Sequence, residues 1–417
     1  LTLRQGAARV APRPPPPPPA SDGRLRILVL SPFPPRLDGA HGGARVIAHM
    51  AAELGDRMRV ALLCLRHPSE APVDAALRAR VERVEEVARP DLASAGARMA
   101  RFVRWRLGLL AGRPFWVSDL RQRAYAARLT ALVAELRPHV VEIEYPAMAQ
   151  YLPIVARSGA ALVLAEYDPE AGRRERGALL RRLDARAWRL VRRRALRAVD
   201  AAIVVTERDR GVLEPLAGPT PLVRIPFGTD FAERSFATGS SDGGLLFVGN
   251  FVHPPNVDAA RRLVTSIYPA VRERRPDCVL HVVGDGPPAD LTSAGVVLTG
   301  RVAAVEPYLE RAAVVVVPLR EGGGMRVKVL EALAAGKAVV ASPLAVEGLD
   351  VVDGRDLVVA GTDEEFARHV LQLLEDPAAR DALGRRARAW AQDNLTWRAS
   401  VEARGRLYAE LLAARRG

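Results

Sequence analysis

The chain has 417 residues, 49% of them hydrophobic and 26% charged, which excludes a wholly disordered protein and predicts two or three globular domains. Lys and Arg number 61 against 48 Asp and Glu, and the net charge of +13 favours anionic partners such as phosphorylated molecules or a membrane surface. Arginine and alanine are abundant along the whole chain, so this charge by itself does not indicate nucleic-acid binding.

The first 24 residues are rich in proline and small polar residues, and they predict a disordered or polyproline tail. Residues 27–30 follow as a short apolar strand, then a loop rich in proline and glycine through Gly43, and then a helical pattern at 44–54. A strand, a glycine-containing loop and a helix in this order are typical of the start of a doubly wound α/β domain.

Short apolar segments with helical stretches between them continue in two series, which a polar, glycine-rich linker at 236–244 separates. Strands of this kind predict parallel sheets buried on both faces, so the expected fold is α/β with two tandem doubly wound domains. Ligands of such domains bind outside the carboxyl ends of the strands, here in the cleft between the domains. The predicted strands are 60–65, 140–144, 161–165, 201–205 and 222–225 in the first series, and 245–248, 279–283, 296–298, 314–318, 338–341 and 356–359 in the second.

The two cysteines, Cys64 and Cys278, lie far apart within apolar strand-like segments. We therefore expect two buried thiols, with no disulfide and no metal site, which fits a reducing compartment. No apolar segment reaches the roughly 18–20 residues that span a bilayer, and we expect no leader segment.

The most informative segment is 320–342, in which the strand at 314–318 leads into three successive glycines and then a helix. A glycine loop before a helix N-terminus presents free backbone N–H groups and the positive end of the helix dipole, which suits a phosphate. Arg326 and Lys328 can neutralise a diphosphate, and Glu331 is suited to bind vicinal hydroxyls such as those of a ribose. The chain has only two lysines, both in this segment, although a chance grouping on an ordinary helix, with Glu331 as a surface partner of the cations, is the alternative.

Three other strand ends carry small residues that let a ligand approach the backbone. Gly249 and Asn250 end the first strand of the second series, Val-Gly-Asp-Gly at 283–286 ends the next, and Gly300 is followed by Arg301 and Val302. The alternative for each of them is ordinary turn chemistry.

Taken together, these segments resemble the retaining GT-B glycosyltransferases of the "glycosyl transferases group 1", family 4-like class, in a subgroup with the motif Gly-Gly-x-Arg-x-Lys-x-Leu-Glu. The resemblance extends from about residue 26 to the C-terminus. The first half contributes Gly42-Gly43 and Ile-Pro-Phe-Gly-Thr-Asp (225–230). The second half contributes Phe-Val-Gly-Asn (247–250), Val-Gly-Asp-Gly-Pro (283–287), Leu-Thr-Gly-Arg-Val (298–302), Val-Val-Pro-Leu-Arg (316–320) and the segment 323–342.

The resemblance implies roles for individual residues. Arg326 and Lys328 would stabilise charge on the departing diphosphate, and Glu331 would hold the donor ribose; these three are the catalytic candidates. Arg301 and Val302 would border the nucleobase, and the backbone near Gly324 would meet the sugar and phosphate. The whole set expected to bind the donor is Gly42, Gly43, Gly249, Asn250, Arg301, Val302, Gly323, Gly324 and Met325.

The chain departs from the family pattern at three points. Many members carry an arginine and a lysine shortly after the Phe-Val-Gly strand, where this chain has Asn250, Phe251 and Val252. Gly323 stands where a glutamate that reaches the donor sugar is often found, and Tyr167 stands where many members have a histidine. A general base is therefore not implied there, and the leaving phosphate of such retaining enzymes can accept the acceptor's proton. Glu144, Tyr167 and Asp168 are the candidates for the acceptor or sugar side.

The resemblance also implies partners and a place of action. We expect a nucleotide-diphosphate sugar as co-substrate, a glycan, a small molecule or a lipid-linked molecule as acceptor, no cofactor, no essential metal and no nucleic acid. The expected location is cytoplasmic, with a role in polysaccharide or cell-envelope synthesis. The expected domains are a tail (1–24), an N-terminal acceptor-side domain (25–235), a linker (236–244), a C-terminal domain that binds the nucleotide sugar (245–395) and a helix that packs back towards the N-terminal domain (396–417).

Two segments, 98–116 and 173–197, combine many arginines with apolar and aromatic residues. This pattern suits the surface of a membrane with anionic lipids, so the protein is expected to be peripheral on the inner face. The alternative is an ordinary solvated helix whose apolar side faces the core.

Two other functions stay open for the chain. A GT-B nucleotide-sugar epimerase would alter the sugar without an acceptor, and a protein that kept the fold but lost catalysis would bind the donor without turnover. The loop after the first strand is rich in proline and has no Gly-x-Gly-x-x-Gly pattern, which argues against a dinucleotide-dependent dehydrogenase.

Overall fold

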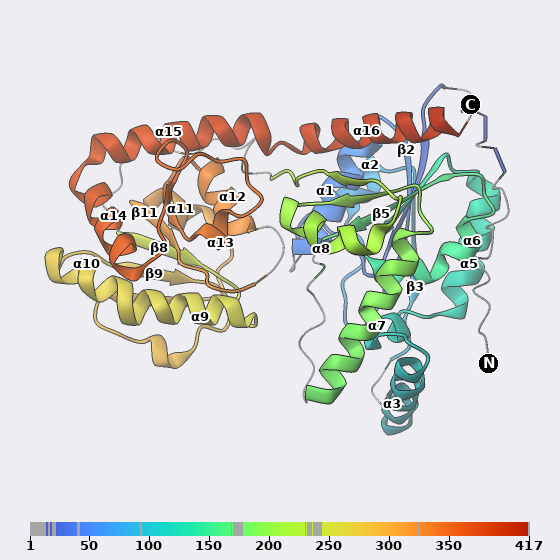
Figure 1. The fold of residues 1–417 in the computed structure, drawn as a ribbon, viewed down its shortest axis with the longest axis horizontal. Coiled ribbons are helices and arrows are strands. Elements are labelled where there is room, and N and C mark those ends of the chain that lie inside the picture. Colours follow the sequence, from blue (N-terminus) through green and yellow to red (C-terminus); the bar gives the residue numbers. More distant parts are fainter. Residues whose placement is uncertain are drawn as a thin grey trace. The chain divides into compact units, whose positions relative to one another are not determined.

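The computed structural model describes residues 14–15, 17–18, 22–39, 42–91, 94–167, 169, 178–229, 231, 236, 244–322 and 326–415. The chain forms two compact units (Figure 1), each built on its own sheet. The first unit comprises 1–204, 209–225 and 401–417, and the second comprises 205–208 and 226–400.

The first unit contains a parallel sheet of seven strands in its described residues, in the order β3-β2-β1-β4-β5-β6-β7. The central strands are almost wholly buried and mainly apolar, because helices cover both faces of such a sheet, and β4 is the exception in carrying two buried glutamates. The strands are β1 (Arg26–Ser31), β2 (Arg59–Arg66), β3 (Arg83–Ala88), β4 (Val140–Glu144), β5 (Ala161–Glu166), β6 (Ala201–Val204) and β7 (Leu222–Arg224).

The helices of this unit are held by local caps and by their apolar faces. Asp74 accepts a hydrogen bond from the backbone N–H of Leu77 and caps α2, and Ser94 caps α3 in the same way. The helices are α1 (Gly42–Gly55), α2 (Ala75–Arg80), α3 (Ala95–Leu110), α4 (Phe115–Asp119), α5 (Arg123–Leu136), the 3-10 turn η1 (Pro146–Tyr151), α6 (Leu152–Val155), α7 (Ala178–Leu196), α8 (Glu207–Ala217) and most of α16 (Trp397–Ala414).

The second unit contains six parallel strands in its described residues, in the order β10-β9-β8-β11-β12-β13. The strands are β8 (Leu245–Val248), β9 (Leu280–Val283), β10 (Val296–Gly300), β11 (Val314–Val317), β12 (Ala338–Ala341) and β13 (Val358–Val359). The helices are α9 (Pro254–Arg262), the π-turn η3 (Leu263–Ile267), α10 (Tyr268–Arg274), η4 (Ala289–Leu291), α11 (Glu306–Arg311), α12 (Val327–Ala334), α13 (Pro343–Val346), α14 (Asp363–Glu375) and α15 (Pro377–Asn394).

The structure confirms the expected fold class of two parallel-sheet α/β units, and all twelve predicted strands have a counterpart in it. The strand that the sequence did not predict is β3, an edge strand whose residues are mostly half-buried. Its sequence, Arg-Val-Glu-Glu-Val-Ala, interleaves charged with apolar residues and therefore lacks the continuous apolar run of a central strand. Cys64 and Cys278 are free and buried, as expected.

The predicted Pro-rich tail and the predicted linker fall largely outside the described residues. Of the tail, Pro18 is described, and its carbonyl accepts a hydrogen bond of 3.1 Å from the Arg26 guanidinium and lies 2.9 Å from Nε2 of His139. In the described part of the chain, no helix combines the length and the apolar character that crossing a bilayer requires.

Candidate functional site

Three loops meet at the carboxyl edge of the second sheet. The backbone N–H of Gly249, after β8, donates to the carbonyl of Val283 (2.9 Å), and that of Gly284, after β9, donates to the carbonyl of Gly300 (3.1 Å). Gly284 has φ +140°, and a Cβ there would collide with the carbonyl oxygen of Gly249. Only glycine allows this approach, so the glycines at these strand ends bring the loops together instead of simply reversing the chain.

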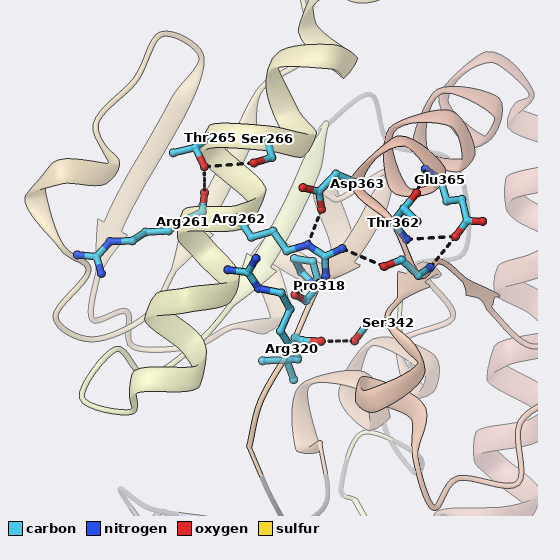
Figure 2. Close-up of polar contacts among 12 residues, drawn as sticks. Arg261, Arg262, Thr265, Ser266, Pro318, Arg320, Ser342, Thr362, Asp363 and Glu365 are labelled. Carbon is cyan, nitrogen blue, oxygen red and sulfur yellow. Dashed lines mark hydrogen bonds and ion pairs between the residues drawn. The ribbon is translucent and has the colours of Figure 1, made fainter.

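The chain that enters the glycine loop after β11 is fixed by side chains from three neighbouring elements. Figure 2 shows the buried Arg262 guanidinium between Asp363 and the carbonyl of Pro318, which accepts from Nη1 at 3.2 Å. The Ser342 hydroxyl donates to the carbonyl of Leu319 at 2.6 Å, and Arg320 forms an ion pair of 2.6 Å with Asp258. Three successive residues are thus held just before the glycines, and the loop begins from a defined position.

The loop leads into α12, whose N-cap is Arg326. The Arg326 guanidinium folds back and donates from Nη2 to the carbonyl of Gly322 at 2.8 Å, and the Arg208 guanidinium approaches the same oxygen at 3.3 Å. Two guanidinium groups therefore lie at the start of the loop, beside a helix N-terminus. Residues 323–325, with the predicted donor-binding Gly323, Gly324 and Met325, lie outside the described residues.

Lys328 lies on the first turn of α12 and reaches the end of β8. Its Nζ donates to Oδ1 of Asn256 at 2.7 Å and lies 4.4 Å from the centre of the Phe247 ring. Burial of the ammonium group and, to a smaller extent, the charge of the nearby Arg326 lower the pKa of Lys328 to about 7, although Glu331 opposes the shift. The cation is therefore held close to two neutral groups, in a place where a negative charge would be stabilised.

The other predicted residues of this unit differ in their burial and in whether they are linked to Lys328. Asn256, the partner of Lys328, also donates from Nδ2 to the carbonyl of Asn250 at 2.7 Å, so the loop after β8 is tied to the helix that carries the cation. Glu331 is half-buried one turn further along α12. Arg301 is exposed at the end of β10, and Val302 packs against the core of the unit.

Gly42 and Gly43 lie at the N-terminus of α1 in the first unit. A Cβ on Gly43 would collide with the hydroxyl of Tyr145, so this position has to be glycine while that tyrosine keeps its place. Tyr145 has a φ of 68°, a conformation that non-glycine residues rarely adopt, and its ring makes edge contacts with Phe33, Trp116 and Tyr167. An aromatic cluster thus adjoins the predicted glycine pair.

The predicted acceptor-side residues Glu144 and Tyr167 touch each other within the first unit. The Tyr167 hydroxyl donates to Oε2 of the buried Glu144 at 2.5 Å, and Oε1 of Glu144 is buried with no hydrogen-bond partner among the described residues. Burial, followed by the charge of Glu142, raises the pKa of Glu144 well above its usual range. Asp168 lies outside the described residues.

Sequence reasoning missed the residues that support these side chains from a distance. Asn256 is 72 positions from Lys328, and Tyr145 is 102 positions from Gly43. Glu142 is bound by Arg404 (3.1 Å) and Tyr408, which lie 262 and 266 positions away. The alternating acidic residues at the end of β4 were the one available signal, because a carboxylate on a buried strand needs a partner.

No group of three or more potential metal ligands occurs among His, Cys, Asp and Glu side chains of the described residues. The positive groups at the glycine loop are instead those of Arg326, Lys328 and Arg208.

Two parallel-sheet α/β units with a glycine loop at the carboxyl edge of the second sheet define the GT-B fold. Solved structures support this: the chain resembles sucrose-phosphate synthase of Thermosynechococcus elongatus with a TM-score of 0.67 and 17% identity, over 94% of this chain and 100% of that one. It also resembles Anabaena HepE in complex with UDP-glucose, with a TM-score of 0.62 and 14% identity over 94% and 100%.

Residues 242–376, which include the whole glycine-loop site, match the family described as Glycosyl transferases group 1. A GDP-mannose-dependent alpha-(1-6)-phosphatidylinositol monomannoside mannosyltransferase of Mycolicibacterium smegmatis is 37% identical over 167 residues, 36% of this chain and 43% of the relative. An uncharacterized glycosyltransferase of Methanocaldococcus jannaschii is 33% identical over 96 residues, 22% of this chain and 24% of the relative. The chain thus matches less than half the length of these curated relatives.

Proposed function

We propose that the protein is a retaining glycosyltransferase, which moves a sugar from a nucleotide-diphosphate donor to a glycan, a small molecule or a lipid-linked acceptor. The observation that carries the proposal is the ammonium group of Lys328, with a pKa of about 7, beside Arg326 at the mouth of the glycine loop. The family match of residues 242–376 and the GT-B fold support it.

The leaving group of this reaction is a nucleoside diphosphate, which gains negative charge as the bond to the sugar breaks. A cation that is already positioned, and that burial has stripped of water, stabilises such charge without reorganising. Lys328 and Arg326 fit this requirement, because both cations are held in place beside the glycine loop: Lys328 donates to the amide oxygen of Asn256 and Arg326 to the carbonyl of Gly322. The diphosphate would restore the full charge of Lys328 by raising its pKa.

We propose the remaining donor contacts for the other predicted residues. Glu331 is one turn from Lys328 and half-buried, which suits a carboxylate that accepts hydrogen bonds from ribose hydroxyls. Arg301 and Val302 lie at the end of β10, and Gly249 and Asn250 at the end of β8, where they would border the base and the sugar. Gly42 and Gly43 would approach the diphosphate from the first unit.

We propose that the reaction proceeds without a protein base. The C1–O bond to the diphosphate breaks, a C1–O bond to the acceptor forms on the same face of the sugar, and the acceptor's proton passes to the leaving diphosphate. The Tyr167 hydroxyl supports this reading, because it stands where many members have a histidine and it donates to Glu144. Burial raises the pKa of Tyr167, and a protonated phenol is not suited to take a proton.

For the acceptor and the place of action we propose only a general class and a general location. One relative named for a phosphatidylinositol monomannoside acceptor, and a structural neighbour solved with UDP-glucose, favour a hexose donor and an acceptor that is a glycan or is linked to a lipid. We propose that the enzyme acts in the cytoplasm in polysaccharide or cell-envelope synthesis, with no cofactor and no essential metal.

A thermal-shift screen of the full chain against nucleoside diphosphates and their sugars tests the donor class first. A ligand at about a hundred times its dissociation constant adds roughly 2.7 kcal/mol of stability. Release of the diphosphate is then measured with the stabilising donor and a panel of acceptors, with and without a chelator. Loss of turnover in the chelator would contradict the absence of an essential metal.

Two outcomes separate the alternatives. An altered sugar after incubation with the donor alone, with no acceptor, would identify an epimerase. Donor binding without turnover on any acceptor would identify a binding protein, which the replacement of a sugar-binding glutamate by Gly323 makes worth testing.

Lys337→Met, a change at the only other lysine, is the matched control for Lys328→Met, since the Lys337 ammonium binds the carbonyl of Glu310, outside the glycine loop.

A further inference from the structure

The helix α3 of the first unit has its polar side towards the protein and its apolar side towards solvent. On the inner side, Arg101 and Arg104 form ion pairs with the buried Asp119 (2.6 and 3.4 Å), and Nε1 of Trp105 donates to the same carboxylate at 2.7 Å. Gly108 lies on the same inner side and packs closely against Ser118, because a Cβ at this position would collide with the Ser118 hydroxyl. The helix is therefore anchored through polar contacts, the reverse of an ordinary amphipathic helix.

The outer side of α3 is a continuous apolar strip. Leu110 is 86% exposed, Met99 62% and Leu107 59%. Together with Phe102 and Val103, these residues recur at three- and four-residue intervals and so share one face of the helix. An open hollow of about 650 Å³ lies over this face, lined mainly by α3 itself.

The neighbouring helix α7 also exposes apolar side chains. It lies close to α3 in the first unit (Figure 1), and its Leu180 and Leu183 are each 43% exposed. Seven of the eleven exposed large hydrophobic side chains among the described residues belong to these two helices. Such a concentration marks an interaction surface, because single exposed apolar residues are normally scattered.

The charge around the strip is positive. The sequence of α3 holds four arginines and no acidic residue, and Arg106 is exposed on the apolar face, with its guanidinium over the Phe102 ring at 4.6 Å. On α7, Arg182, Arg186 and Arg189 are exposed, and the acidic Asp184 is buried. An apolar strip bordered by arginines matches the boundary between acyl chains and anionic headgroups.

A second copy of the chain fits this surface less well. Two-fold pairing through the strip would bring the same arginine-bordered face of both copies together, and α3 has no acidic residue to oppose those arginines. Like charges in contact destabilise such an interface, whereas lipid phosphates neutralise them.

We propose that the outer faces of α3 and α7 dock the first unit on a membrane surface that contains anionic lipids. α3 then lies in the plane of the headgroups with Met99, Leu107 and Leu110 towards the acyl chains. This inference needs no glycosyl transfer, because it depends on the surface of the first unit alone.

Sedimentation of the full chain with vesicles tests the proposal. We expect binding to vesicles of phosphatidylcholine mixed with phosphatidylglycerol, weaker binding to phosphatidylcholine alone, and a loss of binding as salt rises. Reversing the charge with Arg106→Glu and Arg186→Glu should weaken binding by about fivefold or more for each arginine. The pair Leu107→Ser and Leu110→Ser should weaken it on both kinds of vesicle.

Matched changes outside the surface serve as controls. Val352→Ser and Arg385→Glu alter an exposed valine and an exposed arginine of the second unit and should leave vesicle binding unchanged. Unaltered melting curves would show that the α3 and α7 variants are folded, and donor binding, measured separately, keeps the result independent of the enzymatic proposal. Equal binding to neutral and anionic vesicles, or no binding to either, would overturn it. So would a concentration-dependent dimer that the Leu107 and Leu110 changes abolish.

Discussion

Two cations of this protein, the buried Arg404 and the half-buried Lys328, lie one in each unit and have opposite surroundings. Arg404 on α16 is 1% exposed and lies 3.1 Å from the carboxylate of Glu142, which also accepts from Tyr408. Burial alone would lower the pKa of Arg404, but Glu142, Tyr167 and Tyr408 together raise it above its ordinary value. Lys328 donates to an amide oxygen and lies beside an aromatic ring, and burial of its ammonium group, with Arg326 adding to the shift and Glu331 opposing it, lowers its pKa to about 7.

The difference teaches which charge is structural and which is available for chemistry. A buried cation with a carboxylate partner is satisfied by the protein itself, and it attaches α16 to β4 inside the first unit. A cation held between neutral groups costs stability in the free protein and recovers that cost when an anion binds. The same type of group thus serves folding in one unit and, as we propose, the donor diphosphate in the other.

The largest expected effect is on the structural cation. Arg404→Met leaves the buried Glu142 carboxylate without its cation and should lower the free energy of unfolding by about 3–5 kcal/mol. Chemical denaturation measures it. Arg57→Met, which removes the surface pair with Glu402 on the same helix, should cost less than about 1 kcal/mol, since both side chains are more than a third exposed. Equal costs for the two variants would refute the distinction.

The next effect separates turnover from stability at Lys328. Lys328→Met should lower the turnover rate by about 10²–10³-fold, the usual cost of removing one group that stabilises developing charge. Its free energy of unfolding should stay the same or rise, because a buried ammonium with a neutral partner is removed. Rate assays and denaturation of one preparation give both values. A variant that is both unstable and inactive would instead make Lys328 a structural residue.

Donor binding should depend on pH through the same group. A bound diphosphate raises the pKa of Lys328 from about 7, so the complex holds a proton that the free protein has lost. Below pH 7 the lysine is protonated both in the free protein and in the complex, so affinity should not depend on this group. Above pH 7 the affinity should fall by up to about tenfold per pH unit, until the pH exceeds the pKa of Lys328 in the complex. Calorimetry from pH 7.5 to 9, above the terminal phosphate pKa of about 6, measures the affinity and proton uptake.

Two controls make the pH experiment decisive. Lys328→Met should remove both the pH dependence and the proton uptake, while Lys337→Met should retain them. Affinity that is flat across this range in the wild-type protein would mean that Lys328 does not face the diphosphate.

The smallest effect is expected at Glu144. Its raised pKa means that it is neutral in the folded protein, so Glu144→Gln should change the free energy of unfolding by less than about 1 kcal/mol near pH 4. As pH rises above 4.5 the unfolded carboxyl ionises while the folded one stays protonated, so the wild type should lose stability relative to the variant. Glu142→Gln, which removes the charge that pairs with Arg404, should be clearly more destabilising.

Much of the fold followed from local pattern. Segments such as Val314–Pro318 and Ala338–Ala341 are short, apolar and bounded by polar or glycine residues, which predicts central strands of parallel sheets without any knowledge of their neighbours. The edge strand β3 escaped this reasoning, because a strand with one half-covered side needs no continuous apolar run. Its assignment depended on its pairing with β2.

The candidate site divides in the same way, into features that the local sequence predicts and contacts that only the structure shows. The sequence placed Arg326, Lys328 and Glu331 at the start of a helix behind a glycine loop, because all three lie within two turns. It could not show that Asn256 is the partner of Lys328, that Tyr145 dictates a glycine at position 43, or that Arg404 pairs with Glu142, since each contact joins distant segments.

The sequence by itself determined the two α/β units and the local order of glycine, cation and carboxylate, because hydrophobic periodicity and helix geometry act over a few residues. Only the tertiary structure decided which charges are satisfied and which face of α3 is covered. The arginines and apolar residues of 98–116 fitted either an ordinary helix or a membrane surface, and Asp119 turned the arginine side inward. Burial and partners are properties of packing, and packing sets the pKa of Lys328 and the exposure of Leu110.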